Sequence, residues 1–156
     1  MRIALGNDHC GYPMKAEVRA ILDELGLEVI DFGCHSTDPV DFPDISRAVC
    51  DAVRSGKADR GVLLCGTGVG ASMAANKIPG IRAAVCHDVH CAHQGVEHDD
   101  MNVICLGAQI IGPWLAKDLI AAYVQARFVA SEDYKRRVGK LHDLELAAAR
   151  ELKDQI

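Results

Sequence analysis

The sequence has few aromatic residues, no excess of positive charge and no long apolar run, and each shortage excludes a class of protein. Phe, Trp and Tyr make up 4% of the 156 residues, so a core must be built mainly from aliphatic side chains. The formal net charge is −5, which argues against the basic surface that binds nucleic acid. No apolar run reaches the roughly 18 residues of a membrane span. We therefore expect neither a nucleic-acid nor a membrane partner.

The length and composition are those of one globular domain. The chain has 49% hydrophobic and 25% charged residues, and its first residues form too short an apolar stretch for a signal peptide. The seven cysteines are odd in number and lie mostly within apolar stretches, which favours reduced thiols over a disulfide scaffold. We expect a single domain over residues 1–156 that works in the cytoplasm.

Short apolar runs alternate with amphipathic segments along the chain. The runs are near-continuously apolar, as parallel strands covered on both faces are, and they lie at residues 2–6, 28–32, 61–65, 82–86 and 102–106. Segments 13–25, 44–55 and 113–127 carry apolar residues at helical spacing. This alternation predicts a doubly wound, Rossmann-like α/β fold with a five-stranded parallel sheet sandwiched by helices.

The last segment, residues 131–156, has no strand to follow it. It combines many charges with the apolar residues Val138, Leu141, Leu144 and Leu146, a pattern typical of an amphipathic helix. We expect this helix to pack against the domain or against a neighbouring subunit.

The densest motif runs from Cys65 to Ser72 with the sequence Cys-Gly-Thr-Gly-Val-Gly-Ala-Ser. Its glycines allow a sharp turn and leave backbone amide hydrogens unobstructed, and a helix start adds further free donors. The loop follows a predicted strand, and ligands in doubly wound sheets bind beyond the carboxyl ends of the strands. We therefore expect an anionic group to bind there.

Two interpretations compete for this loop. Gly66-x-Gly68-x-x-Ala71 fits a dinucleotide fingerprint, with Asp88 about 20 residues further on as the ribose ligand, and would make the chain an NAD-binding oxidoreductase. Such fingerprints usually open the first βαβ unit, however, whereas two predicted strands and the predicted helices at 13–25 and 44–55 precede the strand that leads into this loop.

In the second interpretation Cys65 is a reactive thiol. The loop amides and the helix start lower its pKa and give a thiolate near neutral pH. The thiolate then removes a proton from carbon beside a carbonyl while the amides hold the enediolate. A non-catalytic sugar-binding module remains a third interpretation.

Histidines and acids near the strand ends could assist this chemistry. Asp8 and His9 follow the first strand and His98 comes just before the fifth, and we expect all three at the same edge of the sheet. Histidine titrates near neutrality and suits proton delivery to a sugar ring oxygen. A second cluster has metal-ligand residue types, but four residues on one short helix cannot all face one ion, so we interpret it as a polar helix at the pocket rim and expect no metal. It comprises His87, His90, Cys91 and His93.

Together these features resemble the ribose-5-phosphate isomerase type B and galactose-6-phosphate isomerase family over roughly residues 1–138. The specific parts are the turn at residues 7–11, the loop at 65–70 and above all the block at 74–84. The resemblance implies an aldose–ketose isomerase that works through a cis-enediol without metal or cofactor. It also implies a homodimer or tetramer with shared active sites, on whose partner subunit the helix over about 131–156 would pack.

The resemblance further implies roles for single residues. Cys65 would move the proton between C1 and C2, Thr67 would assist the enediolate, and His98 would open the sugar ring. Asp8 would bind sugar hydroxyls and His9 the sugar or the phosphate. The substrate-binding residues would be Asp8, His9, Gly66, Gly68, Val69, Gly70, Ser72, Asp99, Gln109 and Arg137.

Three departures from the family's pattern lie at the phosphate end. Asp99 stands where an Asn usually follows the ring-opening His, Gln109 where an Arg is usual, and Asp133 where the first of two Arg is common. Charge-assisted contacts from Arg to phosphate contribute on the order of 1.5–3 kcal/mol each. We therefore expect an isomerase of the ribose 5-phosphate/ribulose 5-phosphate type with an altered phosphate pocket, or one that acts on an unphosphorylated or shorter sugar.

Overall fold

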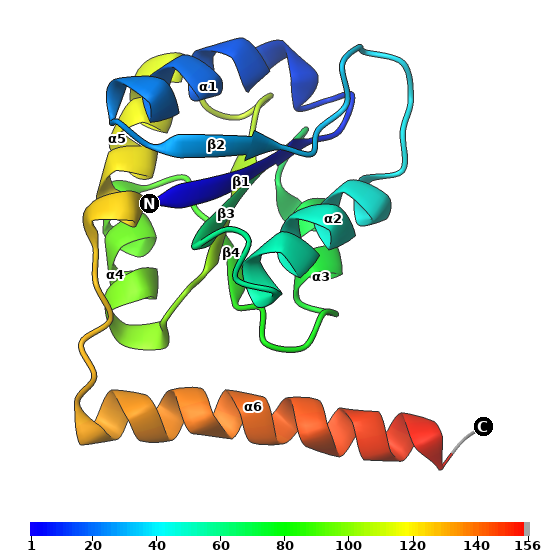
Figure 1. The fold of residues 1–156 in the computed structure, drawn as a ribbon, viewed down its shortest axis with the longest axis vertical. Coiled ribbons are helices and arrows are strands. Elements are labelled where there is room, and N and C mark those ends of the chain that lie inside the picture. The colour runs from blue at the N-terminus through cyan, green and yellow to red at the C-terminus, as the bar shows by residue number, and fades with distance from the viewer. Residues whose placement is uncertain (155–156) are drawn as a thin grey trace.

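A computed structural model of the chain describes residues 1–154 and contains a five-stranded sheet in which all paired strands are parallel (Figure 1). The strand order is β2-β1-β3-β5-β4. The strands are β1 (Arg2–Asn7), β2 (Glu28–Asp31), β3 (Arg60–Cys65), β4 (Ala83–Val85) and β5 (Val103–Gly107). Each predicted strand overlaps an observed one, and the predicted doubly wound α/β fold is confirmed.

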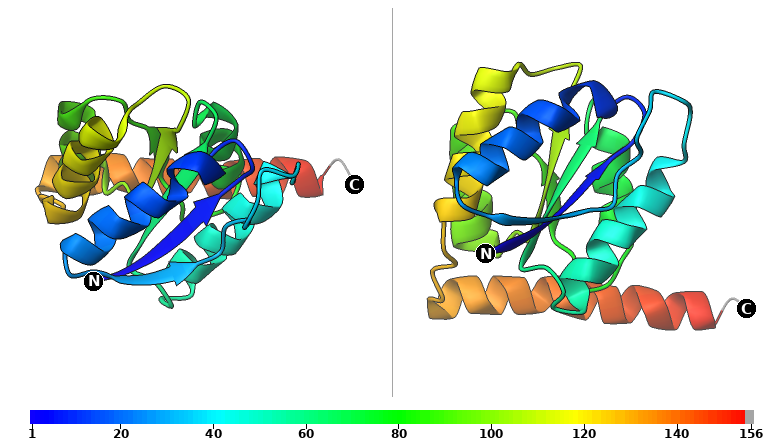
Figure 2. Two further views of the ribbon diagram at one scale, coloured as in Figure 1. Left: turned by 90° about the horizontal axis from the view of Figure 1, so that it is seen from above. Right: turned by 45° about the horizontal axis from the view of Figure 1, so that its top comes forward.

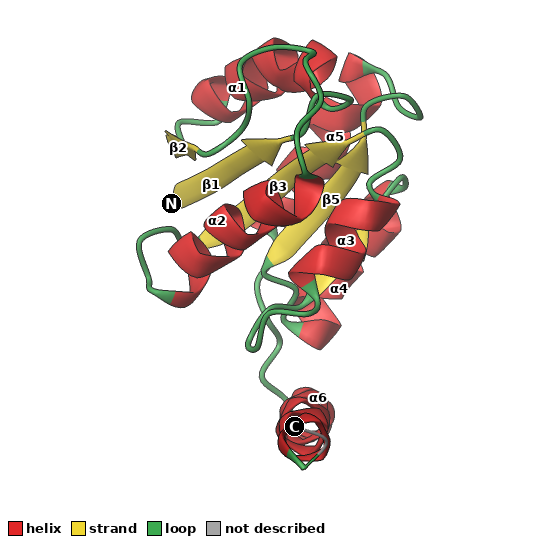
Figure 3. Cartoon of the chain, turned by 90° about the vertical axis from the view of Figure 1, so that its right-hand side faces the viewer, coloured by secondary structure: helices red, strands yellow, loops and turns green. Residues whose placement is uncertain are grey.

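Helices cover both faces of the sheet and give it two hydrophobic cores (Figure 3). One face packs against α1 (Lys15–Glu24), α4 (Val89–Asp99) and α5 (Pro113–Gln125). The other packs against α2 (Phe42–Arg54) and α3 (Val69–Ala75). No helix within residues 1–154 has the length and apolarity needed to cross a membrane.

Three of the cysteines serve these cores as small apolar side chains. Cys50, Cys86 and Cys105 are buried, and all seven thiols are free. Burial raises the pKa of Cys50 and that of Cys86 to about 12. These thiols stay protonated near neutral pH, so a thiol that reacts as a thiolate would have to be one of the cysteines nearer the surface.

Helix α6 (Glu132–Lys153) lies across the amino end of the sheet (Figures 1 and 2). Its Glu145 side chain accepts a hydrogen bond from the amide of Gly80 at 3.0 Å. None of its residues is buried, and Leu141, Leu144 and Leu152 are exposed. Its C-terminal end extends past the domain (Figure 2). The predicted helix is confirmed over the described part of 131–156, and residues 155 and 156 lie outside it.

Candidate active site

The carboxyl end of the sheet brings together the segments that follow β1, β3 and β5. The amide of Asp8 donates to the carbonyl of Leu64 at 3.1 Å, and the amide of Ala108 donates to that of Cys65 at 2.8 Å. Strand β2 lies on one side of β1 and strand β3 on the other, so the crossovers change direction between β1 and β3. Doubly wound sheets bind their ligands at this switch point.

The Cys65 thiol lies at this switch point, half-buried at the end of β3. Burial raises its pKa, and Asp8 raises it further because its carboxylate accepts a hydrogen bond from the thiol. The amides of Gly68 and Gly66 hydrogen-bond to the sulfur and act in the opposite direction. The expected lowering of the pKa is therefore wrong for the free site, where a buried carboxylate and desolvation outweigh two amide donors.

The loop after β3 depends on glycine at two positions. Gly68 has a φ of +81°, and a Cβ atom there would lie 3.3 Å from the backbone carbon of Leu106. A Cβ atom on Gly66 would lie 3.1 Å from the side-chain oxygen of Gln109 and 3.3 Å from Cβ of Cys10. The predicted sharp turn is present, and it places Gln109 against the loop.

The other predicted loop residues lie at the start of α3. Thr67 and Val69 are exposed, and the Thr67 hydroxyl accepts a hydrogen bond from the amide of Val69 at 3.3 Å. Gly70 lies under the ring of Phe42, which would be 3.1 Å from a Cβ atom at that position. Ser72 follows within α3. The loop is thus open to solvent on one side and braced by α2 on the other.

The turn after β1 is held closely against β3. A Cβ atom on Gly11 would lie 2.2 Å from the carbonyl oxygen of Leu64, so only glycine fits there. The amide of Gly11 donates to Oδ1 of Asp8 at 2.8 Å. The amide of Val40 donates to Nδ1 of His9 at 3.2 Å, which leaves Nε2 as the protonated nitrogen of a neutral imidazole. Asp8 and His9 are therefore fixed at the carboxyl edge of the sheet, the edge at which β3 ends in Cys65.

Within residues 1–154, one group of side chains offers metal ligands near one another. Asp8, His9 and Cys10 have ligand atoms within 4.8 Å of each other, but Asp8 Oδ1 and His9 Nδ1 already accept hydrogen bonds from backbone amides. The second predicted cluster starts helix α4 and does not converge: Nε2 of His87 accepts from the amide of Gly107 at 3.1 Å, and His93 faces Glu97 at 3.5 Å.

His98 lies at the opposite end of the domain from Cys65. It is in the last turn of α4, which begins beyond the carboxyl end of β4 and runs about 16 Å toward the start of β5. The expectation that His98 shares an edge with Asp8 and His9 is wrong within one chain. A residue just before a strand of a parallel sheet lies at the amino edge, and Asp8, which follows a strand, lies at the carboxyl edge.

Tyr134, which the sequence analysis missed, joins His98 to Arg137. The Tyr134 and His98 rings are stacked, with centroids 4.4 Å apart and planes 20° apart, and the Tyr134 hydroxyl is 3.0 Å from His98 Nε2. The Arg137 guanidinium carbon lies 5.7 Å from the centroid of the Tyr134 ring. The sequence could have indicated Tyr134 as a site residue, because it lies three residues before Arg137 on a predicted helix and therefore on the same helix face.

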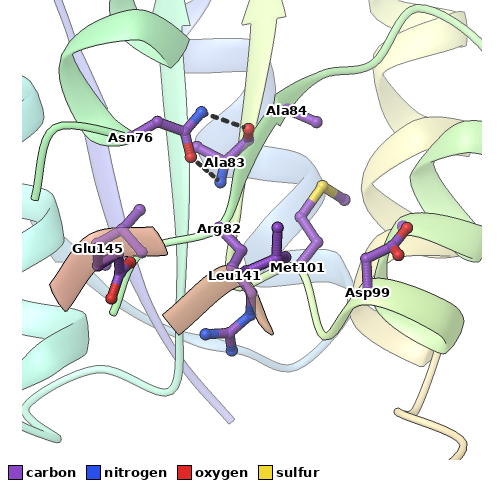
Figure 4. A pocket seen from close by; sticks show the side chains of 10 residues that line it. Asn76, Arg82, Ala83, Ala84, Asp99, Met101, Leu141 and Glu145 are labelled. Atoms are coloured by element: carbon purple, nitrogen blue, oxygen red, sulfur yellow. Dashed lines mark hydrogen bonds between the residues drawn. The ribbon is translucent and has the colours of Figure 1, made fainter. Parts of the chain in front are cut away.

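Asp99 also lies away from Cys65. It lines a cavity of about 310 Å³ between α6 and the amino ends of β4 and β5, which Leu141 and Glu145 of α6 help to enclose (Figure 4). On the far wall the side-chain amide of Asn76 pairs with the backbone of Ala83. Its Nδ2 donates to the carbonyl of Ala83 at 2.8 Å, and its Oδ1 accepts from the amide of Ala83 at 2.9 Å. This cavity contains none of the residues of the glycine-rich loop.

Asp133 is exposed and forms an ion pair with Arg136 at 2.6 Å. The Arg136 guanidinium lowers the pKa of the Asp133 carboxyl, so that the pair stays charged. Because Arg136 is engaged in this way, Arg137 is the arginine of this turn that stays beside Tyr134 and His98.

Asp88 tests the dinucleotide interpretation. Its carboxylate caps α4 by accepting a hydrogen bond from the amide of Cys91 at 2.7 Å, and this bond helps to lower its pKa. The predicted ribose ligand thus has a local structural role. Fold and site together define a doubly wound α/β protein with a thiol, a carboxylate and the backbone amides of a glycine-rich loop at the switch point.

Comparisons with known proteins agree with this class. A family model described as Ribose/Galactose Isomerase matches residues 3–141. Ribose-5-phosphate isomerase B of Escherichia coli is 42% identical, over 86% of this chain and 91% of its own length. D-erythrulose-4-phosphate isomerase of Pectobacterium atrosepticum is 41% identical, over 82% of this chain and 85% of its own.

A solved structure of ribose-5-phosphate isomerase B from Clostridium thermocellum is also similar. It is 44% identical with a TM-score of 0.91, and the match covers 95% of this chain and 99% of that one. The chain belongs to the ribose/galactose isomerase family of sugar-phosphate isomerases, enzymes that interconvert aldoses and ketoses. The family resemblance drawn from the sequence is confirmed.

Proposed function

We propose that the chain interconverts an aldose phosphate and a ketose phosphate of the ribose 5-phosphate type through a cis-enediol, with Cys65 as the base. The observation that carries this proposal is the Cys65 sulfur at the switch point, between the Asp8 carboxylate and the amides of Gly66 and Gly68. A base that moves a proton between adjacent carbons needs such a position, beside donors for the developing oxyanion.

The reaction proceeds by transfer of one proton. The Cys65 thiolate takes the proton from C2 of the open-chain aldose, the C–H electron pair forms the C1=C2 bond, and the carbonyl oxygen on C1 becomes the enediolate oxyanion. Amides of the loop at 66–70 and the Thr67 hydroxyl stabilise that charge. The proton of the C2 hydroxyl moves to O1, C2 becomes the carbonyl carbon, and Cys65 returns its proton to C1.

Substrate binding can supply the thiolate despite the raised pKa of the free thiol. A sugar hydroxyl that donates to Asp8 takes the place of the thiol at that carboxylate. One cause of the raised pKa is then removed, while the amide hydrogen bonds of Gly66 and Gly68 remain to favour the thiolate. Asp8 in this scheme binds the sugar and, until the sugar arrives, holds the pKa of Cys65 higher than burial alone does.

We further propose that two copies of the chain share each site. His98, Asp99 and Arg137 lie at the amino end of the domain, too far from their own Cys65 to touch the same small sugar. A second copy can bring its own His98 and Arg137 to the carboxyl end of the first. The exposed leucines of α6 favour packing of this helix on the partner, with residues 1–156 forming one domain in a homodimer or tetramer.

The phosphate end is proposed to differ from that of close relatives. The names of the Escherichia coli and Pectobacterium atrosepticum relatives both describe sugar phosphates, which supports a phosphorylated substrate. Here Asp133 pairs with Arg136 and Gln109 lies against Gly66, so Arg137 and His9 are left to hold the phosphate. An unphosphorylated or shorter sugar is the alternative that substrate comparison tests. The seven free thiols suit a reducing cytoplasm as the place of action.

The decisive experiment follows the C2 proton. Ribose 5-phosphate is incubated in D₂O with the wild-type enzyme and with the Cys65→Ser and Cys91→Ser variants, and deuterium at C2 and C1 is measured by NMR. Cys65→Ser is expected to lose exchange while still binding the sugar phosphate, and Cys91→Ser, which changes an exposed cysteine, is expected to exchange normally. Undiminished exchange by Cys65→Ser would refute the role of Cys65 as the base.

A further inference from the structure

The last turn of α4 and the first turn of α6 form a built contact. The amide of Val129 donates to the carbonyl of Glu97 at 2.9 Å, which fixes the segment that leads into α6. The Ser131 side chain caps α6 by accepting a hydrogen bond from the amide of Tyr134 at 3.3 Å. These bonds place the Tyr134 side chain over His98.

Tyr134 restrains His98 in two ways. Ring stacking at 4.4 Å fixes the plane of the imidazole, and the hydroxyl at 3.0 Å from Nε2 fixes its rotation within that plane. The other group facing Nε2 is the Glu97 carboxylate, at 3.8 Å. The Tyr134 hydroxyl and the Glu97 carboxylate therefore both face Nε2 of His98. Neither group faces Nδ1, so a substrate can contact the ring at that nitrogen.

We propose that Tyr134 is a positioning residue for sugar ring opening: its hydroxyl donates to Nε2 of His98 and leaves the proton of the neutral imidazole on Nδ1, the atom that protonates the ring oxygen. This inference rests on the proposed isomerase function. In the step, His98 Nδ1 gives its proton to the ring oxygen, the bond from C1 to that oxygen breaks and C1=O forms. The proton of the C1 hydroxyl passes through water back to His98, which ends the step as a neutral imidazole again.

The same tyrosine connects ring opening to the phosphate end. Arg137 lies one helical turn after Tyr134, with its guanidinium 5.7 Å from the Tyr134 ring. His98 and Arg137 are thus held by one side chain and reach a substrate as a unit with a fixed separation. A residue that only stabilised α6 would have no reason to contact both.

The test compares two substrates that differ in their need for ring opening. Ribose 5-phosphate closes to a furanose, whereas erythrose 4-phosphate cannot, because its C4 oxygen carries the phosphate. Tyr134→Phe keeps the stacking and the Arg137 contact but removes the hydroxyl. It is expected to lower kcat on ribose 5-phosphate about tenfold, as loss of one positioned hydrogen bond does, with KM little changed and turnover of erythrose 4-phosphate unaltered.

A matched variant and a spectroscopic readout keep the proposal open to refutation. Glu97→Gln changes the other group near Nε2 and is expected to leave the ratio of the two activities unchanged. Equal losses on both sugars in Tyr134→Phe, or no loss on either, would overturn the proposal. Nitrogen-15 NMR of His98 is expected to give the Nδ1–H tautomer in the wild-type enzyme and to lose it in Tyr134→Phe.

These readouts also separate the two proposals. If the wild-type enzyme converts neither sugar phosphate, the proposed function fails, and the NMR spectrum still reports which nitrogen of His98 carries the proton. An Nε2–H tautomer in the wild-type enzyme would contradict the proposed direction of the hydrogen bond, whatever the turnover.

Discussion

The carboxylate of Asp8 accepts a hydrogen bond from the thiol of Cys65 across the junction of β1 and β3. Asp8 is only 4% exposed, so its charge acts on the sulfur with little screening by water. Burial of the thiol and this contact raise the pKa of Cys65 in the free enzyme, whereas the amides of Gly66 and Gly68 favour the thiolate. The balance between these opposing contacts can be measured directly.

The variant Asp8→Asn is expected to lower the pKa of Cys65. The substitution removes a negative charge that disfavours the thiolate and leaves both amide hydrogen bonds in place. At a fixed pH near neutrality, iodoacetamide should therefore modify Cys65 faster in the variant than in the wild-type enzyme. Mass spectrometry of the Cys65 peptide across a pH series gives the two midpoints, with the exposed Cys91 as a reference in each sample. An equal or higher midpoint in Asp8→Asn would contradict this account.

The variant Gly68→Ala is expected to lose both stability and activity. A φ of +81° costs an L-residue roughly 1–2 kcal/mol, and the new Cβ would also meet the backbone of Leu106 at 3.3 Å. Gly56→Ala is the matched control, because its φ is +73° and no atom lies within 4 Å of the new Cβ. Denaturant unfolding should detect a loss of stability in both variants. Only Gly68→Ala should also lower kcat. A similar loss of kcat in Gly56→Ala would show that the lowered activity does not come from the change in the loop.

Most of the fold could be predicted from the sequence because apolar runs and helical periodicity are local signals. The loop at 65–72 was likewise predictable, since its glycines mark a turn regardless of what packs beside it. The position of His98 was not, although the rule that decides it is simple. Its place just before β5 puts it at the amino edge of a parallel sheet, and only the course of α4 makes that plain.

The direction of the Cys65 pKa shift could not be predicted for a different reason. It depends first on how far the thiol is buried and then on β1 being the neighbour of β3, which brings Asp8 to the sulfur. Hydrophobic periodicity encodes neither strand order nor the burial of one strand-end side chain. The stacking of Tyr134 on His98 likewise depends on how α6 crosses α4. Contacts between distant segments are the part of the site that needed the structure.

The variant Gln109→Arg is expected to strengthen binding of the substrate's phosphate group. Gln109 lies against Gly66, so a guanidinium there would be close to a sugar phosphate bound over the loop. One added charge-assisted contact should raise kcat/KM for ribose 5-phosphate about tenfold and leave that for ribose unchanged. Gln109→Met, which removes the polar group without adding charge, is the control. Equal changes for the two sugars would place residue 109 away from the phosphate.

The sharing of sites between two copies predicts complementation between inactive variants. Cys65→Ser lacks the base and His98→Asn lacks the ring-opening acid, so each variant alone should have little activity on ribose 5-phosphate. If each site combines Cys65 of one copy with His98 of the other, a mixed dimer of the two variants contains one intact site and one doubly damaged site.

Random exchange of subunits gives mixed dimers as about half of the population, so about a quarter of the wild-type activity should return. The two variants are denatured together, refolded and assayed, and each variant refolded alone is the control. Sites built within single chains would give no recovery, because every chain in the mixture lacks either Cys65 or His98. Recovery would therefore establish that the distance between these residues in one chain is bridged by a second copy.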